Sequence, residues 1–182
     1  MRTITLITTG GTIEKTYDEQ TGDLANRRSL VRRMLSELRL EGTEVNVLEL
    51  MSKDSLEMTD ADRARIVGAV RVAGACEEDG GTHGVVVLHG TDTLARTGEQ
   101  LCAELEAMTA PVVLTGAMRP WEMKQSDALQ NLTEAIFAVG VLPPGVYCVA
   151  HGRALAFPGV RKDVERGTFV REAPGEREPK TR

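Results

Sequence analysis

Short apolar runs alternate with longer stretches of mixed polarity along most of the chain. The runs are rich in β-branched residues, and several are apolar at nearly every position, as in strands that are buried on both faces. They predict five strands, at residues 3–8, 44–51, 84–88, 111–115 and 146–151. The periodic stretches between them predict four helices, at residues 30–38, 60–76, 94–108 and 127–139.

Two side chains are predicted to cap helices at their first turns. Thr59 precedes Asp60, and Ser126 precedes Asp127. A side-chain oxygen at such a position accepts a hydrogen bond from an amide that the helix leaves unpaired. The alternation of strands and helices predicts an α/β fold, a doubly wound and mostly parallel sheet with helices on both faces.

The length of 182 residues and the hydrophobic fraction of 41% predict one domain, at residues 1–170. Residues 171–182 contain charges, Pro and Gly but little to bury, so we predict a disordered tail there. The polar stretch 17–28, which includes Gly22, is suited to a mobile flap.

Composition excludes several classes of function. Lys and Arg number 22 against 27 Asp and Glu, and the net charge of −5 together with 3% aromatic residues disfavours nucleic acid. Three separated cysteines and three scattered histidines have neither disulfide nor metal-site spacing, so no metal is expected. No apolar run approaches the ~18 residues that span a bilayer, and no signal peptide is evident. We therefore expect no membrane contact and a soluble, cytoplasmic protein.

Unusual sequences follow four of the predicted strands. They read "TTGGT", "LMSKD", "LHGTDT" and "LTGAMRP". In a doubly wound sheet, ligands bind beyond the carboxyl ends of the strands, so these four loops should meet in one cleft. Taken singly, each has a plainer explanation: a glycine-rich phosphate turn without the lysine of a P-loop, or, for "GTDT", the start of a helix.

The combination is more specific. "TTGGTIEK", "HGTDTL" and "LTGAMRP", in this order, resemble the bacterial-type L-asparaginase family. The resemblance covers roughly residues 1–169, which is the N-terminal domain of the larger members, and is closest to the short single-domain form. It implies hydrolysis of L-asparagine to L-aspartate and ammonia through a covalent acyl-threonine, without metal or cofactor.

The resemblance also assigns catalytic roles. Thr12 is the expected nucleophile, and Tyr17 in the flap would hold or relay its proton. Thr91, Asp92 and Lys162 would form a second cluster that manages protons, with the lysine acting either as a base or as an electrostatic support. By default Lys162, which lies among other charges, would be a solvated side chain.

Substrate contacts are assigned in the same way. Asp92 would accept from the ammonium group of the substrate, and Ser52 resembles the serine that binds its carboxylate. Lys53 would add positive charge there or point to solvent, and Ala117 would line the side from which ammonia leaves. The expected donors to the oxyanion are the amides around Gly11, Thr12, Thr91 and Asp92. Arg119 and Trp121 are expected to be structural, with a smaller chance of touching a ligand or a partner subunit.

The larger members of the family carry a second domain that completes the site of a neighbouring subunit. We therefore expect a homo-oligomer, a dimer or a tetramer, in which subunits cover each other's clefts. Glutamine is one methylene longer than asparagine, which a pocket disfavours by only ~1–3 kcal/mol, so weak glutaminase activity is expected. The alternatives are a non-catalytic amino-acid sensor and a partner in an amidotransferase that acts on aminoacylated tRNA, the latter disfavoured by the negative charge.

Overall fold

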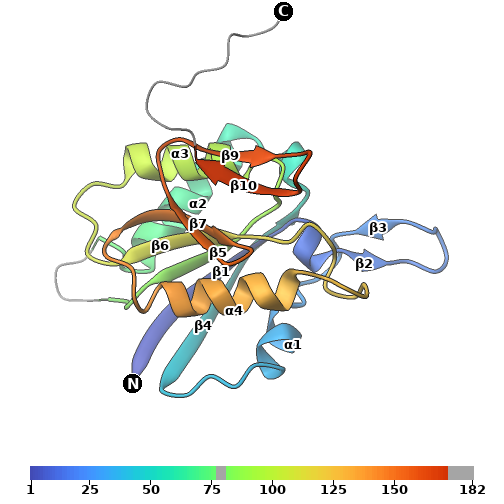
Figure 1. Cartoon of the computed structure of the whole chain (residues 1–182), viewed down its shortest axis with the longest axis horizontal. Helices are drawn as coiled ribbons and strands as arrows, with labels where there is room; N and C mark the ends of the chain where they lie inside the picture. The colour runs from blue at the N-terminus through green and yellow to red at the C-terminus, as the bar shows by residue number, and fades with distance from the viewer. Residues whose placement is uncertain (77–80, 172–182) are drawn as a thin grey trace, which may run out of the picture.

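A six-stranded sheet forms the centre of the protein (Figure 1). The computed structural model describes residues 1–76 and 81–171. Five strands are parallel and one edge strand, β8, is antiparallel. Their order is β4-β1-β5-β6-β7-β8, with bounds β1 Arg2–Gly10, β4 Thr43–Lys53, β5 Val85–Leu88, β6 Pro111–Thr115, β7 Gly145–Ala150 and β8 Arg153–Ala156. The α/β fold and all five predicted strands are confirmed.

Four helices cover the sheet, as predicted. They are α1 Val31–Ser36, α2 Asp60–Val72, α3 Leu94–Glu104 and α4 Ala128–Ala138. Helices α2 and α3 each end four residues before their predicted ends. Leu105 has an extended backbone and Gly74 a φ of 86°, yet Leu105 and Ala75 are still buried in the core. The apolar pattern therefore continues past the end of each helix.

One predicted cap is confirmed and the other is displaced. The Thr59 hydroxyl accepts from the Asp62 amide at 3.2 Å, and the Asp62 carboxylate accepts from the Thr59 amide at 2.9 Å, which makes a reciprocal capping box. Helix α4 begins one residue later than expected, with Asp127 at the N-cap position. The Ser126 hydroxyl still accepts from the Ala128 amide, at 3.1 Å, while the Asp127 carboxylate accepts from other groups.

Helices pack on both faces of the sheet. Side chains alternate across β5, so that Val85 and Val87 face α2 and α3, while Val86 and Leu88 face α1 and α4. Burial of both faces explains why β5 has no polar position. None of the helices within residues 1–76 and 81–171 is long and apolar enough to cross a lipid bilayer.

The connection through α4 differs in hand from the one through α3. Helices α3 and α4 link strands that step in the same direction along the sheet, but they pack on opposite faces. Their crossovers therefore have opposite hands, although such units are right-handed in nearly all proteins. As a result the loop 116–127 lies on the α1 side, where the Trp121 amide donates to the Ile13 carbonyl at 3.4 Å.

Two hairpins outside the main sheet were not predicted. One pairs β2 Thr16–Tyr17 with β3 Leu24–Ala25, and the other pairs β9 Val160–Asp163 with β10 Thr168–Arg171. Their strands have two to four residues and are largely polar, so they lack a periodic signal. Residue 171 belongs to β10 and not to the predicted tail, the rest of which lies outside the described residues. The predicted single domain, 1–170, stays a prediction.

Candidate functional site

The site lies where the order of strands reverses. From β1 the chain passes to β4 on one side and then to β5 on the other. Loops that follow such strands diverge and leave a crevice at the carboxyl edge of the sheet. The loop after β1 begins at Gly11, and the loop after β5 begins at His89.

Direct backbone contacts join the four loops that the sequence singled out. A Cβ atom on Gly11 would lie 2.4 Å from Gly90 Cα, and one on Gly90 would lie 2.5 Å from Ser55 Oγ. A Cβ atom on Gly116 would lie 2.2 Å from the His89 oxygen and 3.3 Å from Thr91 Cγ2. The missing side chains allow this approach, and the loops after β1, β4, β5 and β6 meet as their sequences predict.

Lys162 contacts both Thr91 and Asp92. Its Nζ donates to Thr91 Oγ1 at 2.9 Å and to Asp92 Oδ1 at 2.7 Å. Thr91 is buried, the Lys162 side chain is 19% exposed and that of Asp92 is 43% exposed. The structure thus brings these three predicted residues together across a separation of 70 positions in the sequence, with the carboxylate facing outward.

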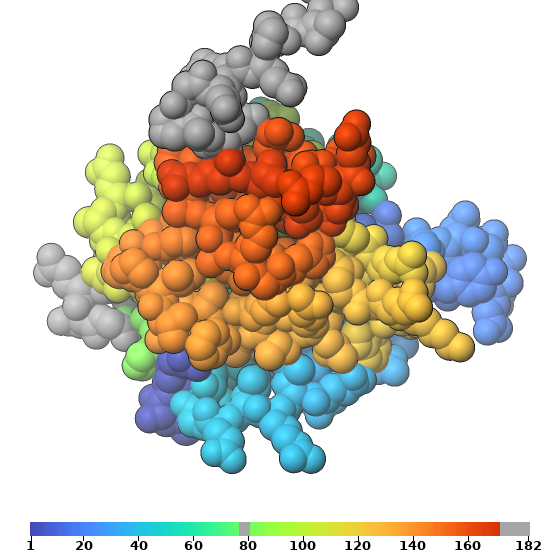
Figure 2. Space-filling model, viewed as in Figure 1, coloured from blue at the N-terminus to red at the C-terminus, as the bar shows by residue number. Residues whose placement is uncertain are grey.

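The hairpin β9–β10 delivers Lys162 to this position. Lys162 pairs with Phe169 across the hairpin, and Phe169 and Val160 are buried in the layer that includes α3. Figure 2 shows this hairpin on the surface of the molecule, above β8 and α4. Apolar anchoring on one side of the hairpin leaves the lysine free to reach the loop after β5.

Thr12 begins a short 3-10 helix, η1 Thr12–Glu14, next to the contact between Gly11 and Gly90. Glu14 is buried and fixes this turn, because its carboxylate accepts from the Thr8 hydroxyl at 2.5 Å and from the Leu30 amide at 3.1 Å. Thr12 is half-buried and lies beside the loop that carries Thr91.

Tyr17 lies on the β2–β3 hairpin, which stands out from the body of the molecule (Figures 1 and 2). The residue is 58% exposed, and its amide donates to Glu122 Oε2 at 3.1 Å. The hairpin occupies the stretch predicted as a flap. In this conformation the phenol points away from the body of the protein into solvent rather than toward Thr12.

Lys53 differs from the prediction because β4 is longer than expected. The strand continues to Lys53, two residues beyond the predicted end, so Ser52 and Lys53 are not in the loop. Lys53 Nζ donates to Asp62 Oδ2 at 2.8 Å, and this bond, with those from Thr59, lowers the pKa of Asp62. The ammonium group is thereby directed to the start of α2 and away from Thr12.

Ser52 also lies elsewhere. It is exposed and lines a cavity of about 380 Å³ together with Arg27, Arg28 and Glu49. The lining of that cavity includes neither Thr12 nor Thr91. The assignment of Ser52 as a carboxylate ligand is therefore corrected.

Ser55 occupies the place expected for Ser52. It is 1% exposed, it touches Gly90, and its Oγ atom has no hydrogen-bond partner in the described part of the chain. Lys15 Nζ binds Asp54 Oδ2 at 2.6 Å and lowers the pKa of that carboxyl, which ties this turn to η1. The signal in the sequence was the first turn-forming pair after the true strand end, "DS", which follows Lys53 directly.

Two further assignments need adjustment. The Gly11 amide donates to the Lys53 carbonyl at 2.8 Å, so it is not free for an oxyanion, and the Thr12, Thr91 and Asp92 amides remain as candidates. Ala117 is buried with Ile13 in the layer below the loop. It supports the site from beneath, since the neighbouring Gly116 makes the contact with Thr91.

His89 lies under the site in a neutral form. Its Nδ1 lies 2.8 Å from the Gly90 carbonyl and its Nε2 lies 2.8 Å from Thr97 Oγ1. Complete burial lowers the pKa of His89 to about 4. A neutral ring donates through Nδ1 and accepts through Nε2, which fixes the carbonyl of Gly90.

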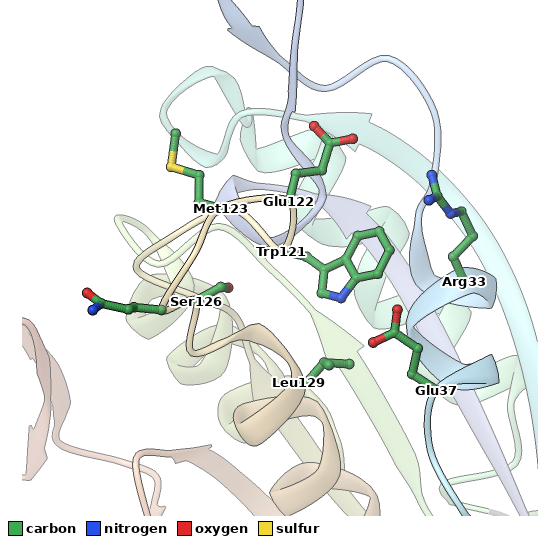
Figure 3. A pocket seen from close by; sticks show the side chains of 8 residues that line it. Arg33, Glu37, Trp121, Glu122, Met123, Ser126 and Leu129 are labelled. Atoms are coloured by element: carbon green, nitrogen blue, oxygen red, sulfur yellow. The ribbon is translucent and has the colours of Figure 1, made fainter.

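Another cavity, of about 610 Å³, lies between α1 and the loop 116–127 (Figure 3). The Arg33 guanidinium lies 5.1 Å from the centre of the Trp121 ring at its edge. Its lining does not include the cluster of Thr91, Asp92 and Lys162. Trp121 is thus structural with one face against Arg33, as expected. No group of side chains within residues 1–76 and 81–171 is arranged to hold a metal ion.

Comparison with known proteins gives the same region of similarity. The family model "Asparaginase, N-terminal" matches residues 3–170. L-asparaginase from Thermococcus kodakarensis has a TM-score of 0.78 at 28% identity over 93% of this chain and 51% of its own. L-asparaginase I from Vibrio cholerae has a TM-score of 0.79 at 26% identity, with the same coverage of 93% and 51%.

Curated relatives carry a different name. A glutamyl-tRNA(Gln) amidotransferase subunit from Thermoplasma acidophilum is 34% identical over 145 residues, 76% of this chain and 33% of the relative. Its counterpart from Metallosphaera sedula is 32% identical over 166 residues, 87% of this chain and 37% of the relative. The chain spans about a third of the length of these relatives and about half that of the solved asparaginases. By its matched region and its fold, this chain belongs to the asparaginase family.

Proposed function

We propose that this chain hydrolyses the side-chain amide of L-asparagine to L-aspartate and ammonia, through an acyl intermediate on Thr12. The observation that carries the proposal is the position of Lys162 Nζ, 2.9 Å from the Thr91 hydroxyl and 2.7 Å from the Asp92 carboxylate. A cation that binds a buried hydroxyl at a crevice supports proton transfer better than it supports simple binding.

Substrate binding uses charges of opposite sign. The outward-facing Asp92 carboxylate accepts from the ammonium group of asparagine, because its second oxygen remains available beside Lys162. The Ser55 hydroxyl donates to the α-carboxylate. A buried hydroxyl without a partner costs roughly 1–3 kcal/mol, and a bound carboxylate removes that cost.

The first chemical step makes an acyl-enzyme. Thr12 Oγ1 attacks the amide carbon, a C–O bond forms, and the electrons of the C=O bond move to the oxygen, which accepts from backbone amides of the adjoining loops. The hydroxyl proton passes to the amide nitrogen, the C–N bond breaks and ammonia leaves. Tyr17 supplies the path for this proton when the β2–β3 hairpin closes over Thr12.

The second step releases aspartate. Water attacks the ester carbon, its proton passes to Thr12 Oγ1 as the C–O bond breaks, and free Thr12 returns. Thr91 orients this water through its hydroxyl, and Lys162 stabilises the developing negative charge. The two threonines therefore act in turn, one as the nucleophile and one as the holder of the water.

Ammonia release is the direct test. L-asparagine, L-glutamine and their D-forms are compared side by side, and L-asparagine is expected to give the highest kcat/KM. Glutamine follows more slowly, by roughly 10- to 200-fold, the effect of one methylene. Replacing Thr12 by Ala should abolish turnover while the circular dichroism spectrum is unchanged. An unchanged rate in that variant would exclude the mechanism, and no ammonia from any substrate would favour an amino-acid sensor.

A second candidate is an ammonia-supplying subunit of a tRNA-dependent amidotransferase. It is favoured by the 34% identity to the glutamyl-tRNA(Gln) amidotransferase subunit from Thermoplasma acidophilum. The net charge of −5 disfavours direct tRNA contact, so a partner protein would hold the tRNA. A kcat/KM for glutamine above that for asparagine would support this candidate over an asparaginase.

We further propose that the protein acts in the cytoplasm as a dimer or tetramer whose subunits cover each other's clefts. The exposure of Asp92 and of the β2–β3 hairpin supports this, because an open cleft binds a small ligand weakly. Light scattering that detects a fully active monomer at assay concentration would contradict it.

A further inference from the structure

A chain of three side chains connects α4 to the β9–β10 hairpin. His151 Nε2 lies 2.8 Å from Asp127 Oδ2, and His151 Nδ1 lies 3.0 Å from Thr168 Oγ1. All three residues are partly buried. The proposed reaction uses none of them, although the arrangement of acid, imidazole and hydroxyl is highly ordered.

The charge of Asp127 fixes the direction of these hydrogen bonds. Burial raises the pKa of Asp127, but bonds from the Met118 amide, the His151 ring and the Arg119 amide outweigh it, and the pKa is lowered overall. The carboxylate is therefore ionised and can only accept, so the proton of a neutral His151 ring is on Nε2. Nδ1 then accepts from the Thr168 hydroxyl.

The same carboxylate organises the loop after β6. Asp127 Oδ1 accepts from the amides of Met118 at 3.0 Å and Arg119 at 3.1 Å. Asn131 donates to the Gly116 carbonyl at 2.9 Å and accepts from the His151 amide at 3.0 Å. Because Gly116 touches Thr91, one end of this network reaches the loop that carries Thr91.

The other end of the network reaches the strand that carries Lys162. Thr168 is the first residue of β10, and the next residue, Phe169, pairs directly with Lys162. The hairpin belongs to a separate two-stranded sheet, so it lacks the continuous hydrogen bonds that hold a strand of the main sheet. A side-chain tether at Thr168 therefore limits how far Lys162 can move from Thr91.

The backbone of His151 is strained. Its φ is 53°, in the left-handed region that side chains other than Gly, Asn and Asp seldom adopt. Such a conformation persists only where surrounding contacts determine it. The hydrogen bonds of the ring and of the amide supply those contacts.

We propose that His151 is a positioning residue: it bridges Asp127 and Thr168, and through Thr168 it holds Lys162 on Thr91 and Asp92. Its effect on turnover rests on the proposed function, whereas its effect on the position of Lys162 does not. Thr168→Val removes the hydroxyl donor at nearly constant volume, and Thr168→Ser retains it. His151→Asn, which tolerates a positive φ, is the second variant.

The first measurement is independent of activity. The rate of acetylation of Lys162 by acetic anhydride is followed by peptide mass spectrometry, with exposed Lys124 as the internal reference. In Thr168→Val and His151→Asn the relative rate should rise about fivefold, the equivalent of one lost hydrogen bond of roughly 1 kcal/mol. Thr168→Ser should match the unmodified protein.

The second measurement is kinetic. In Thr168→Val, kcat for L-asparagine should fall about tenfold with KM nearly unchanged, because proton transfer is affected more than binding. In a Lys162→Met background, Thr168→Val should cause no further fall, because residues that act through one another are not additive.

Two results would overturn the inference: a relative acetylation rate that stays the same in both Thr168→Val and His151→Asn, or a full additive loss of kcat in the Lys162→Met background. If the unmodified protein releases no ammonia from any amide, the proposed function fails. The acetylation rates then decide the inference alone.

Discussion

Gly11 and Gly90 touch each other through their backbones at the point where strand order reverses. A Cβ atom on Gly11 would lie 2.4 Å from both Cα and N of Gly90. Gly11 precedes Thr12, and Gly90 precedes Thr91, so this one contact sets the separation of the two threonines. Any side chain at Gly11 would force the loops apart.

Gly11→Ala should therefore destabilise the fold and inactivate the protein. The φ of Gly11 is 80°, which costs an L-residue ~1–2 kcal/mol, and the clash with Gly90 adds roughly 1–3 kcal/mol. Gly22→Ala is the matched control, because its φ is 75° and an added Cβ atom would meet nothing within 4 Å among the described residues. Urea denaturation should show a clearly larger loss for Gly11→Ala. Equal losses would mean that the contact carries no energy.

Ser55→Ala separates binding from stability. Removing a buried hydroxyl without a described partner should leave the free energy of unfolding unchanged or raise it slightly. The KM for asparagine should rise about tenfold or more, since a hydrogen bond to a charged group is worth ~1.5–3 kcal/mol. Ser52→Ala, on the exposed part of β4, should change neither quantity. A raised KM in Ser52→Ala alone would return the carboxylate site to Ser52.

Lys162→Met tests the proton-transfer cluster. The loss of the ammonium group should lower kcat about 100-fold or more, the usual range for acid–base groups. Lys53→Met breaks an ion pair whose lysine side chain is 40% exposed, so it should cost at most ~1 kcal/mol of stability and leave kcat unchanged. Steady-state ammonia release measures both variants. Comparable kcat values for the two would remove Lys162 from the mechanism.

His89 predicts how stability depends on pH. Its pKa in the folded protein is about 4, below the ordinary value of 6.5, so the unfolded chain binds the extra proton between those values. Stability is then complete above pH 6.5 and falls by about 3 kcal/mol as the pH drops to 4. Urea titrations at several pH values should give this slope. The slope should be absent in His89→Gln, and its persistence there would assign it to other groups.

Sequence predicted the main sheet well because each strand has a strong local signal. Val85–Leu88 is apolar at every position, and such runs form strands that are buried on both faces. The helix ends were less predictable, since Leu105 keeps the apolar pattern after its backbone has become extended. Short polar strands such as β9 have no signal of their own, because the packing of Phe169 and Val160 makes them.

The site was predicted where glycine and hydroxyl residues mark strand ends, as at Thr12 and Thr91. Ser55 was missed because the end of β4 was placed two residues early, and that shift moved Ser52 into the loop. The contact between Gly90 and Ser55 joins distant segments, so the chain order alone does not reveal it. The same holds for the bond between His151 and Asp127.

The most direct test of the account is the capture of an acyl group on Thr12. The protein is mixed with L-asparagine, quenched with acid within milliseconds to seconds, digested and examined by mass spectrometry. The account predicts one aspartyl group on the peptide that contains Thr12, lost in Thr12→Ala and accumulating in Lys162→Met, where its hydrolysis is slowed. Ammonia release with an aspartyl group on the Thr91 peptide, or with none on either peptide at any time, would contradict it.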